Sequence, residues 1–276
     1  MVDAPLPDID LDGHVVIVTG ADRGLGRAMS LALAEKGAQL VLASPAFDAL
    51  RFVAGEIAAA AGADRAIAIE TDITDLSSCR NCLAQTLEAF GRLDVLVNNA
   101  RRPHRGPGLP PTGNSFPFYD TNPQIYRETV EVNVTGTFFM AYTVAPYFIE
   151  QGHGKIINLT TSVHNFSGGA NSPYGVTKAA VDAETYIWAK DLDGTGVTCN
   201  ALLPGGACDS DPERVKKPGQ SLLPVEVMNP VLIWLCSERS DGVTGGRFNG
   251  SLWDSSLDVD AAGERCREPA AFVGME

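Results

Sequence analysis

Tyr174 and Lys178 form a pair whose types and spacing suit proton transfer in this 276-residue chain. They lie four residues apart at the start of an expected helix, so both side chains project from one face. A free tyrosine has a pKa near ~10 and is a poor acid or base at neutral pH. A neighbouring ammonium favours the phenolate and lowers that pKa towards the working range. Because such a pair is also common on helix surfaces, its interpretation depends on the rest of the chain.

A glycine-rich turn, Thr19-Gly20-Ala21-Asp22-Arg23-Gly24-Leu25-Gly26, lies between the first expected strand and the first expected helix. Gly20 permits a tight turn, while Gly24 and Gly26 let the backbone approach a phosphate and let the helix pack closely on the strand. The helix that begins near Leu25 offers free N–H groups and a positive dipole end to a pyrophosphate. This position favours a dinucleotide site over a tight turn without a ligand.

Two positions bear on the choice between NAD and NADP. Folds that prefer NAD usually place a carboxylate at the end of the second strand, where it binds the ribose 2′-OH. That place falls on the neutral Ser44, and Arg23 in the glycine turn could meet a 2′-phosphate. We therefore expect NADP to be preferred, the alternative being that Arg23 is simply solvated.

Short apolar runs predict strands, and longer segments with helical periodicity separate them. The strands are expected at 14–19, 39–43, 65–70, 93–97, 155–159 and 197–203, and the helices from 25 to the glycine at 37 and at 47–61, 76–90, 123–149 and 174–192. Continuous apolar strands that alternate with helices predict a parallel sheet covered on both faces. We expect a single α/β domain over 1–276, a Rossmann-type doubly wound parallel sheet of seven strands. Its core would span 13–250, followed by a C-terminal extension at 251–276.

Composition narrows the class of partner. The chain is 45% hydrophobic and carries a formal net charge of −13. Such an acidic protein is a poor candidate for binding nucleic acid or an anionic membrane, and the sequence has neither a secretory signal nor an apolar run long enough for a transmembrane helix. Cys79 and Cys82 form a lone C-x-x-C, so we expect packed free thiols, no bound metal and a reducing, cytoplasmic location.

Six motifs occur in a fixed order along the chain. They are T-G-x-x-x-G-x-G from Thr19, Asn98-Asn99-Ala100, Asn133 in V-N-V-T-G, hydroxyl residues after 155–159, Tyr174-x-x-x-Lys178, and Pro204-Gly205. Each motif alone is unspecific, but together they closely resemble the short-chain dehydrogenase/reductase family over about 13–250.

The resemblance implies roles for the matching residues. Tyr174 would be the general acid in reduction and the base in oxidation, while Lys178 would lower the pKa of Tyr174 and hold the nicotinamide ribose. Asn133 would bend its helix and hold a water of the proton relay. The expected cofactor contacts are adenine for Asp72 and Ile73, the adenine-side ribose region for Asn99, and the carboxamide for the segment of Pro204, Gly205 and Ala207. For Asn99 and Asn133, the alternatives are turn stabilisation and a helix kink.

The catalytic hydroxyl departs from the family pattern, in which it is usually a serine. A count without gaps places it at Thr161, thirteen residues before Tyr174, and the adjacent Ser162 is the alternative. Threonine can donate the same hydrogen bond to a carbonyl.

Three further departures concern loops. Arg101 stands where the family usually has glycine, and Arg102, His104 and Arg105 follow it; this loop either recognises a carboxylate or phosphate on the substrate or is a solvated basic loop. Gly206 and Ala207 replace larger apolar residues, which suggests a roomier floor beside the nicotinamide. The usual C-terminal V-D-G-G is replaced by 248–254, and the tail beyond it either folds over a neighbouring subunit or is disordered.

The resemblance implies an oxidoreductase that transfers a hydride between NAD(P) and a small-molecule alcohol/carbonyl pair. Two alternatives are a lyase or epimerase on the same fold and a non-catalytic nucleotide-binding protein. The family usually forms dimers or tetramers, so a homodimer or homotetramer is expected. The sequence does not predict which alcohol or carbonyl compound is the substrate.

Overall fold

The computed structural model describes residues 5–102, 117–210 and 221–269. Its centre is an eight-stranded sheet in the order β3-β2-β1-β4-β5-β6-β7-β8. The strands are β1 (Val15–Thr19), β2 (Gln39–Ser44), β3 (Ala66–Glu70), β4 (Val95–Asn98), β5 (Gly154–Leu159), β6 (Val197–Leu203), β7 (Arg247–Asn249) and β8 (Arg267–Glu268). The first seven pair in parallel, and β8 is antiparallel to β7. The strand order reverses between β1 and β4, where doubly wound sheets bind ligands.

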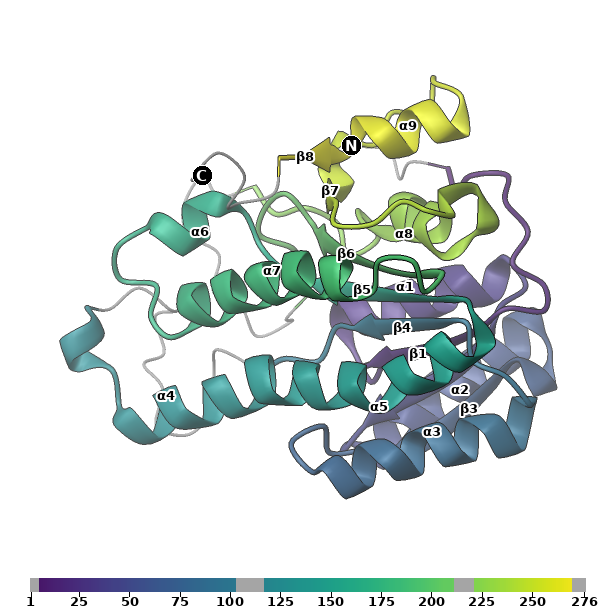
Figure 1. Ribbon diagram of the computed structural model, residues 1–276, viewed down its shortest axis with the longest axis horizontal. Helices are drawn as coiled ribbons and strands as arrows, with labels where there is room; N and C mark the ends of the chain where they lie inside the picture. The colour runs from purple at the N-terminus through teal and green to yellow at the C-terminus, as the bar shows by residue number, and fades with distance from the viewer. Residues whose placement is uncertain (1–4, 103–116, 211–220, 270–276) are drawn as a thin grey trace.

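Helices cover both faces of the sheet (Figure 1). One face carries α1 (Gly24–Glu35), α2 (Phe47–Ala61) and α8 (Asn229–Cys236), and the other carries α3 (Leu76–Phe90), α5 (Gly136–Gln151) and α7 (Tyr174–Asp191). Alternate residues of β1 enter both apolar cores, Val16 and Val18 on the first face and Val15 and Ile17 on the second. A strand buried on both faces requires such an unbroken apolar run.

The parallel, doubly wound sheet confirms the predicted fold class. The bounds of α2, α3 and β6 coincide with the predicted ranges, and the other predicted strands differ by one or two residues at their ends. The sheet has eight strands rather than the expected seven, because the C-terminal segment adds β8 beside β7.

The predicted helix at 123–149 is interrupted. It consists of α4 (Pro123–Val130), a π-helical segment at Glu131–Thr135, and α5. A π segment adds a residue to one helical turn and often occurs at functional sites. Asn133 lies in the middle of this segment, at the place where the family resemblance implied a bend.

The C-terminal extension folds back onto its own chain. After a short 3-10 turn at Gly250–Leu252, α9 (Val259–Arg265) packs on α8, and β8 pairs with β7. Gly263 makes the close approach possible, because a Cβ there would lie 2.6 Å from Cε2 of Trp234. The described part of the tail is therefore ordered against its own chain, so the expected disorder does not apply to these residues.

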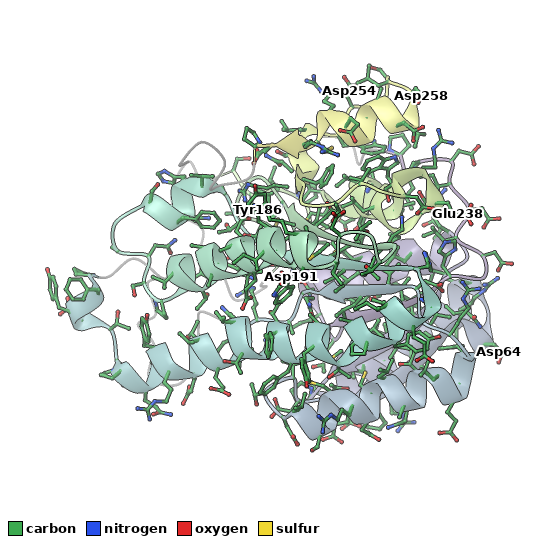
Figure 2. All side chains as sticks on the ribbon, in the orientation of Figure 1. Asp64, Tyr186, Asp191, Glu238, Asp254 and Asp258 are labelled. Atoms are coloured by element: carbon green, nitrogen blue, oxygen red, sulfur yellow. The ribbon has the colours of Figure 1, made fainter. Side chains whose placement is uncertain are left out.

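The cysteines are buried, and the acidic surface residues are spread over the molecule. All six cysteines are buried free thiols. Burial raises the pKa of Cys79 to about 12 and that of Cys82 to about 11, so both are protonated thiols on the buried face of α3. The acidic side chains labelled in Figure 2 are spread over turns and helix ends, namely Asp64, Asp191, Glu238, Asp254 and Asp258. No helix within the described ranges is long and apolar enough to cross a membrane.

Candidate active site

The glycine-rich turn joins β1 to α1 at the carboxyl edge of the sheet. Gly20 and Gly24 have φ angles of +64° and +54°, which favour glycine. A Cβ on Gly26 would lie 2.6 Å from Nδ2 of Asn99 and would collide with the carbonyl oxygen of Gly20. All three glycines of the motif are therefore required by the backbone geometry.

Asn99 fastens the end of β4 to this turn. Its Nδ2 donates to the carbonyl oxygens of Thr19 and Gly20 at 2.8 and 3.0 Å. Thr19 Oγ1 in turn accepts from the main-chain N–H groups of Asn99 and Ala100. Asn99 therefore stabilises the turn, which was the alternative role expected for this residue. Through the same contacts it shapes the candidate cofactor site.

The start of α1 fits a dinucleotide pyrophosphate. Arg23 occupies the N-cap position without capping the helix through its side chain, and the first turn contains no acidic residue. The first N–H groups, including that of the half-buried Leu25, face no competing carboxylate of their own turn, and the helix dipole favours an anion there. Arg23 is largely exposed, with Asp22 Oδ2 at 3.6 Å from its Nε.

The expected adenosine contacts lie at the ends of β2 and β3. Ser44 ends β2 and is buried, with its Oγ accepting from the N–H of Ala46. Asp72 is exposed, and its Oδ1 accepts from both the N–H and the hydroxyl of Thr74. Ile73 is buried against the start of α5, where a Cβ on Gly136 would lie 2.6 Å from its Cγ1.

Asn133 connects the loop after β4 to α7. Its Oδ1 accepts from the N–H of Arg102 at 2.8 Å, and its Nδ2 donates to Thr177 Oγ1 at 3.0 Å. Thr177 donates its hydroxyl to the carbonyl of Tyr174. Through these two hydrogen bonds, the amide of Asn133 braces the first turn of the helix that carries Tyr174.

Lys178 lies under the site, 3% exposed. Its Nζ donates to the carbonyl of Leu159 at the end of β5, at 2.6 Å. Burial, and to a smaller extent the positive charge of Arg101, lowers the pKa of Lys178 to about 7. A pKa shifted this far marks Lys178 as a candidate functional residue.

Thr161 and Ser162 lie in different surroundings. Thr161 is buried, and its Oγ1 accepts from Nδ2 of Asn165 at 2.6 Å. Ser162 is partly exposed and starts α6 (Val163–Ser167), where its hydroxyl makes no capping hydrogen bond. Because Asn165 occupies a lone pair of Thr161 Oγ1, the hydroxyl proton of Thr161 remains available to a substrate oxygen.

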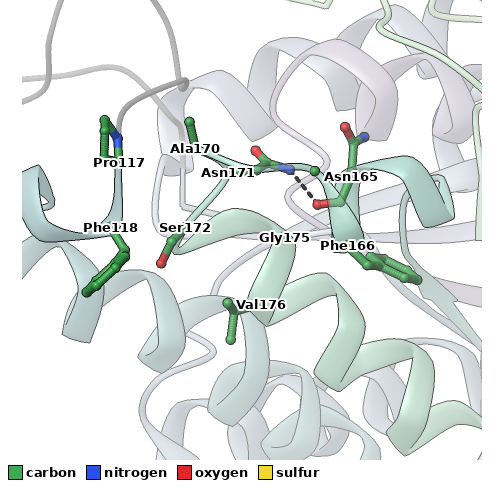
Figure 3. A pocket seen from close by; sticks show the side chains of 10 residues that line it. Pro117, Phe118, Asn165, Phe166, Ala170, Asn171, Ser172, Gly175 and Val176 are labelled. Carbon is green, nitrogen blue, oxygen red and sulfur yellow. Dashed lines mark hydrogen bonds between the residues drawn. The ribbon is translucent and has the colours of Figure 1, made fainter.

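Asn165 was not predicted as a site residue. The segment between β5 and α7 has no strong periodicity, and the only signal is a polar side chain four residues after Thr161, one helical turn away. Asn165 also lines a pocket of about 280 Å³ (Figure 3), and its carbonyl accepts from Nδ2 of Asn171 at 2.6 Å. Gly175 and Val176, directly after Tyr174, line the same pocket. The remaining walls are Pro117, Phe118, Phe166, Gly168, Ala170, Asn171 and Ser172.

The segment after β6 returns over the glycine turn. Gly205, after Pro204, has a φ of +85°, and Ser210 O would lie 3.1 Å from a Cβ on Gly24. The space beside Gly206, where a roomier floor was expected, is taken by Leu223, whose Cδ1 would lie 3.0 Å from a Cβ there. Ala207 is exposed, and its carbonyl accepts from the N–H of Leu223.

The two arginines after Ala100 differ in their pairing. Arg102 binds Glu128 Oε2 through Nε and Nη2 at 3.0 and 2.6 Å, so it is held on α4. Arg101 is exposed, and its charge acts on Lys178. His104, Arg105 and most of the basic loop lie outside the described residues, as does much of the segment at 205–224.

A family model described as short chain dehydrogenase matches residues 14–217, which is most of the chain and includes all the motifs above. The chain belongs to the short-chain dehydrogenase/reductase family. It is 28% identical over 245 residues to a 3-oxoacyl-[acyl-carrier-protein] reductase of Thermotoga maritima, covering 85% of this chain and 95% of that protein. It is 38% identical over 195 residues to an L-rhamnose 1-dehydrogenase (NAD(P)(+)) of Azotobacter vinelandii, covering 69% and 72% of the two chains.

Solved structures of the family share the fold. A 3-ketoacyl-(acyl-carrier-protein) reductase from Brucella melitensis, complexed with NADH, matches with a TM-score of 0.74 and 27% identity, covering 86% of this chain and 96% of that one. Levodione reductase matches with a TM-score of 0.73 and 25% identity, covering 85% and 94%. The chain is accordingly an oxidoreductase that uses a nicotinamide cofactor and acts on an alcohol/carbonyl pair. The comparisons give no support to the lyase, epimerase or non-catalytic alternatives.

Proposed function

We propose that Tyr174, Thr161 and Lys178 form the reaction centre of this dehydrogenase/reductase. The nicotinamide cofactor, when bound, supplies or accepts the hydride. Tyr174 gives a proton to the carbonyl oxygen in reduction and takes it back in oxidation, while Thr161 donates a hydrogen bond to the same oxygen. Lys178 adjusts the pKa of Tyr174 and binds the nicotinamide ribose.

The hydrogen bond from Asn165 to Thr161 carries the choice of Thr161 over Ser162. It fixes the buried hydroxyl as a donor, whereas Ser162 lies at a partly exposed helix start. Asn133, whose amide is used by Arg102 and Thr177, acts by bracing α7. Its main-chain carbonyl, which accepts from Thr137 Oγ1 and sits in the π segment, is the place for a relay water.

The cofactor lies across the glycine turn in this proposal. Gly20, Gly24, Leu25 and Gly26 hold the pyrophosphate, Ser44, Asp72, Ile73 and Asn99 line the adenosine side, and Pro204, Gly205 and Ala207 lie beside the carboxamide. The neutral Ser44 and the exposed Arg23 favour NADP over NAD. The protein acts as a homodimer or homotetramer, and its six buried free thiols favour a reducing compartment such as the cytoplasm.

Tyr174→Phe tests the assignment, because it removes only the hydroxyl. Turnover of a panel of secondary alcohols and carbonyls, followed at the nicotinamide absorbance, should be abolished while cofactor binding persists. Thr161→Val should lower kcat by about 10²-fold or more, and Ser162→Ala should lower it less. Near wild-type turnover of Tyr174→Phe, or a larger loss from Ser162→Ala, would refute the proposed roles.

A further inference from the structure

Arg247 is a charged residue buried directly behind the proposed reaction centre. It belongs to β7, is 1% exposed, and is among the largest fully buried side chains of the described residues. Its Nη2 donates to the main-chain carbonyl of Thr161 at 2.6 Å, and its Nη1 donates to Asp182 Oδ1 at 2.9 Å. The Nε makes no hydrogen bond to the described residues, but it lies within ion-pair distance of Glu268 Oε2, at 3.3 Å.

These partners come from separate parts of the site. Asp182 follows Tyr174 and Lys178 at steps of four residues, so the three side chains lie on one stripe of α7. Thr161 carries the proposed hydroxyl, and Glu268 belongs to β8 of the C-terminal extension. One guanidinium therefore connects the helix of the acid/base pair, the oxygen-binding residue and the last strand of the sheet.

The chemistry of the cluster indicates a requirement for geometry rather than for stability alone. Burying a guanidinium is costly unless carboxylates and carbonyls surround it, and a well-packed apolar pair is often equally stable. An arginine presents five donors in a rigid plane, so it can hold partners in several fixed directions at once. The ring of Phe166, on the pocket wall, lies 5.4 Å from the guanidinium carbon and limits its movement further.

We propose that Arg247 is a positioning residue for the reaction. Through Asp182 and the carbonyl of Thr161, it fixes the distance between the Thr161 hydroxyl and the Tyr174–Lys178 stripe of α7. Through Glu268, it makes that distance depend on β8. The proposal rests on the reaction centre proposed above.

The decisive experiment is a double-mutant cycle of Arg247→Lys and Thr161→Val, in which kcat and cofactor Kd are measured for all four proteins. Arg247→Lys keeps the positive charge but loses the planar guanidinium that binds Asp182 and the Thr161 carbonyl together. The Thr161 hydroxyl should then be displaced, and a displaced reacting group lowers the rate strongly. We expect kcat to fall about tenfold or more, with cofactor Kd changed less than about twofold. In the Thr161→Val background, Arg247→Lys should lower kcat by less than about threefold, because the hydroxyl that Arg247 positions is already absent. Equal losses in the two backgrounds, or an unchanged kcat, would show a general structural role and overturn the proposal.

A second measurement does not require activity. The methyl resonance of Thr161, assigned by its loss in Thr161→Val, should shift or broaden in Arg247→Lys. If the substrate panel shows no turnover even with the unaltered protein, the proposed function fails, and this resonance still tests whether Arg247 positions Thr161. An unchanged resonance in Arg247→Lys would overturn the positioning role of Arg247.

Arg239→Lys is the matched control. Arg239 also makes a bidentate pair, with Asp260 on α9 at 2.8 and 2.7 Å, but both partners are about half exposed and lie away from the site. The kcat and the Thr161 resonance of Arg239→Lys should equal those of the unaltered protein.

If Arg247→Lys does not fold, Glu268→Gln replaces it in the same cycle. Glu268 is partly exposed, so its substitution should cause a smaller loss of kcat. Additive losses there would equally overturn the proposal.

Discussion

Lys178 is the residue whose surroundings differ most from those of an ordinary lysine. It is buried, with one hydrogen-bond acceptor for its Nζ among the described residues, the carbonyl of Leu159, and with Arg101 as a positive neighbour. Both factors disfavour the ammonium, which explains the pKa of about 7. A glycine, the family's usual residue at position 101, would remove the second factor.

The lowered pKa of Lys178 has a consequence for stability. Between pH ~7 and ~10, the unfolded chain holds this proton and the folded chain does not, so the free energy of unfolding rises with pH in this window. Below pH ~7, the cost of burying the charge is fully present. Lys178→Met should therefore gain stability relative to the unaltered cofactor-free protein at pH 6, and this gain should shrink above pH 7 by about 1.4 kcal/mol per pH unit. Urea unfolding at several pH values measures the difference, with Lys190→Met, an exposed lysine of α7, as the control. A difference independent of pH would contradict the argument.

Cofactor choice depends on two residues at the other end of the site. An arginine that meets a 2′-phosphate contributes roughly 1.5–3 kcal/mol, which is about 10- to 150-fold in affinity. Asp22 lies 3.6 Å from Arg23 and opposes a phosphate, so we expect the lower end, about tenfold in favour of NADP. Arg23→Ala should narrow the gap, and Ser44→Asp should reverse it by adding a 2′-OH acceptor that repels phosphate. Fluorescence titrations with both cofactors decide this, and tighter binding of NAD by the unaltered protein would show that Arg23 and Ser44 were misinterpreted.

At the scale of elements, the approach of α1 to β4 depends on the absence of a side chain at Gly26. A Cβ there meets a backbone carbonyl and the Asn99 amide, and neither can move without opening the turn. Gly26→Ala should destabilise the fold by about 1–3 kcal/mol and weaken cofactor binding. The control is Gly55→Ala in the exposed middle of α2, where a Cβ meets nothing within 4 Å and should stabilise by about 0.5–1 kcal/mol. Thermal unfolding and cofactor titration of both variants provide the measurements; the idea fails if Gly26→Ala behaves like Gly55→Ala.

The elements predicted from the sequence are those with a strong local pattern. The apolar run of β6 and the amphipathic patterns of α2 and α3 gave their observed bounds. By contrast, α8 was not predicted, because all eight of its residues are buried and it has no polar face to mark a helical period. β8 is a two-residue polar strand that exists through its pairing with β7.

The same distinction applies to the candidate site. The glycines, Asn133, Tyr174 and Lys178 belong to motifs that can be recognised along the chain. Asn165 and Arg247 become important only through contacts with Thr161, four and 86 residues away in sequence. A single charged residue in a short strand gives no local indication that it is buried beside a reaction centre.

At the scale of the whole molecule, α5 and α7 share a surface that carries exposed apolar side chains. Phe138, Tyr142 and Ile149 on α5 and Val176 and Ile187 on α7 are between 41% and 54% exposed. Phe138 packs against Tyr142 and against Trp188, with ring centroids 5.6 and 6.4 Å apart, which joins the two helices into one surface. Apolar surfaces of this kind mark protein–protein interfaces. Tyr174 is the first residue of α7, and Asn133 lies in the π segment directly before α5.

This surface predicts where the proposed homo-oligomer is joined. In a twofold interface each substitution occurs twice, so Ile187→Arg introduces two charges into an apolar contact. Light scattering after gel filtration should show the unaltered protein as a dimer or tetramer and Ile187→Arg as a smaller species. Phe52→Arg is the matched control, because Phe52 is 68% exposed on α2, which lies on the opposite face of the sheet. Its mass should equal that of the unaltered protein. A monomeric unaltered protein would exclude the oligomer, and an equal effect of both arginines would place its interface elsewhere.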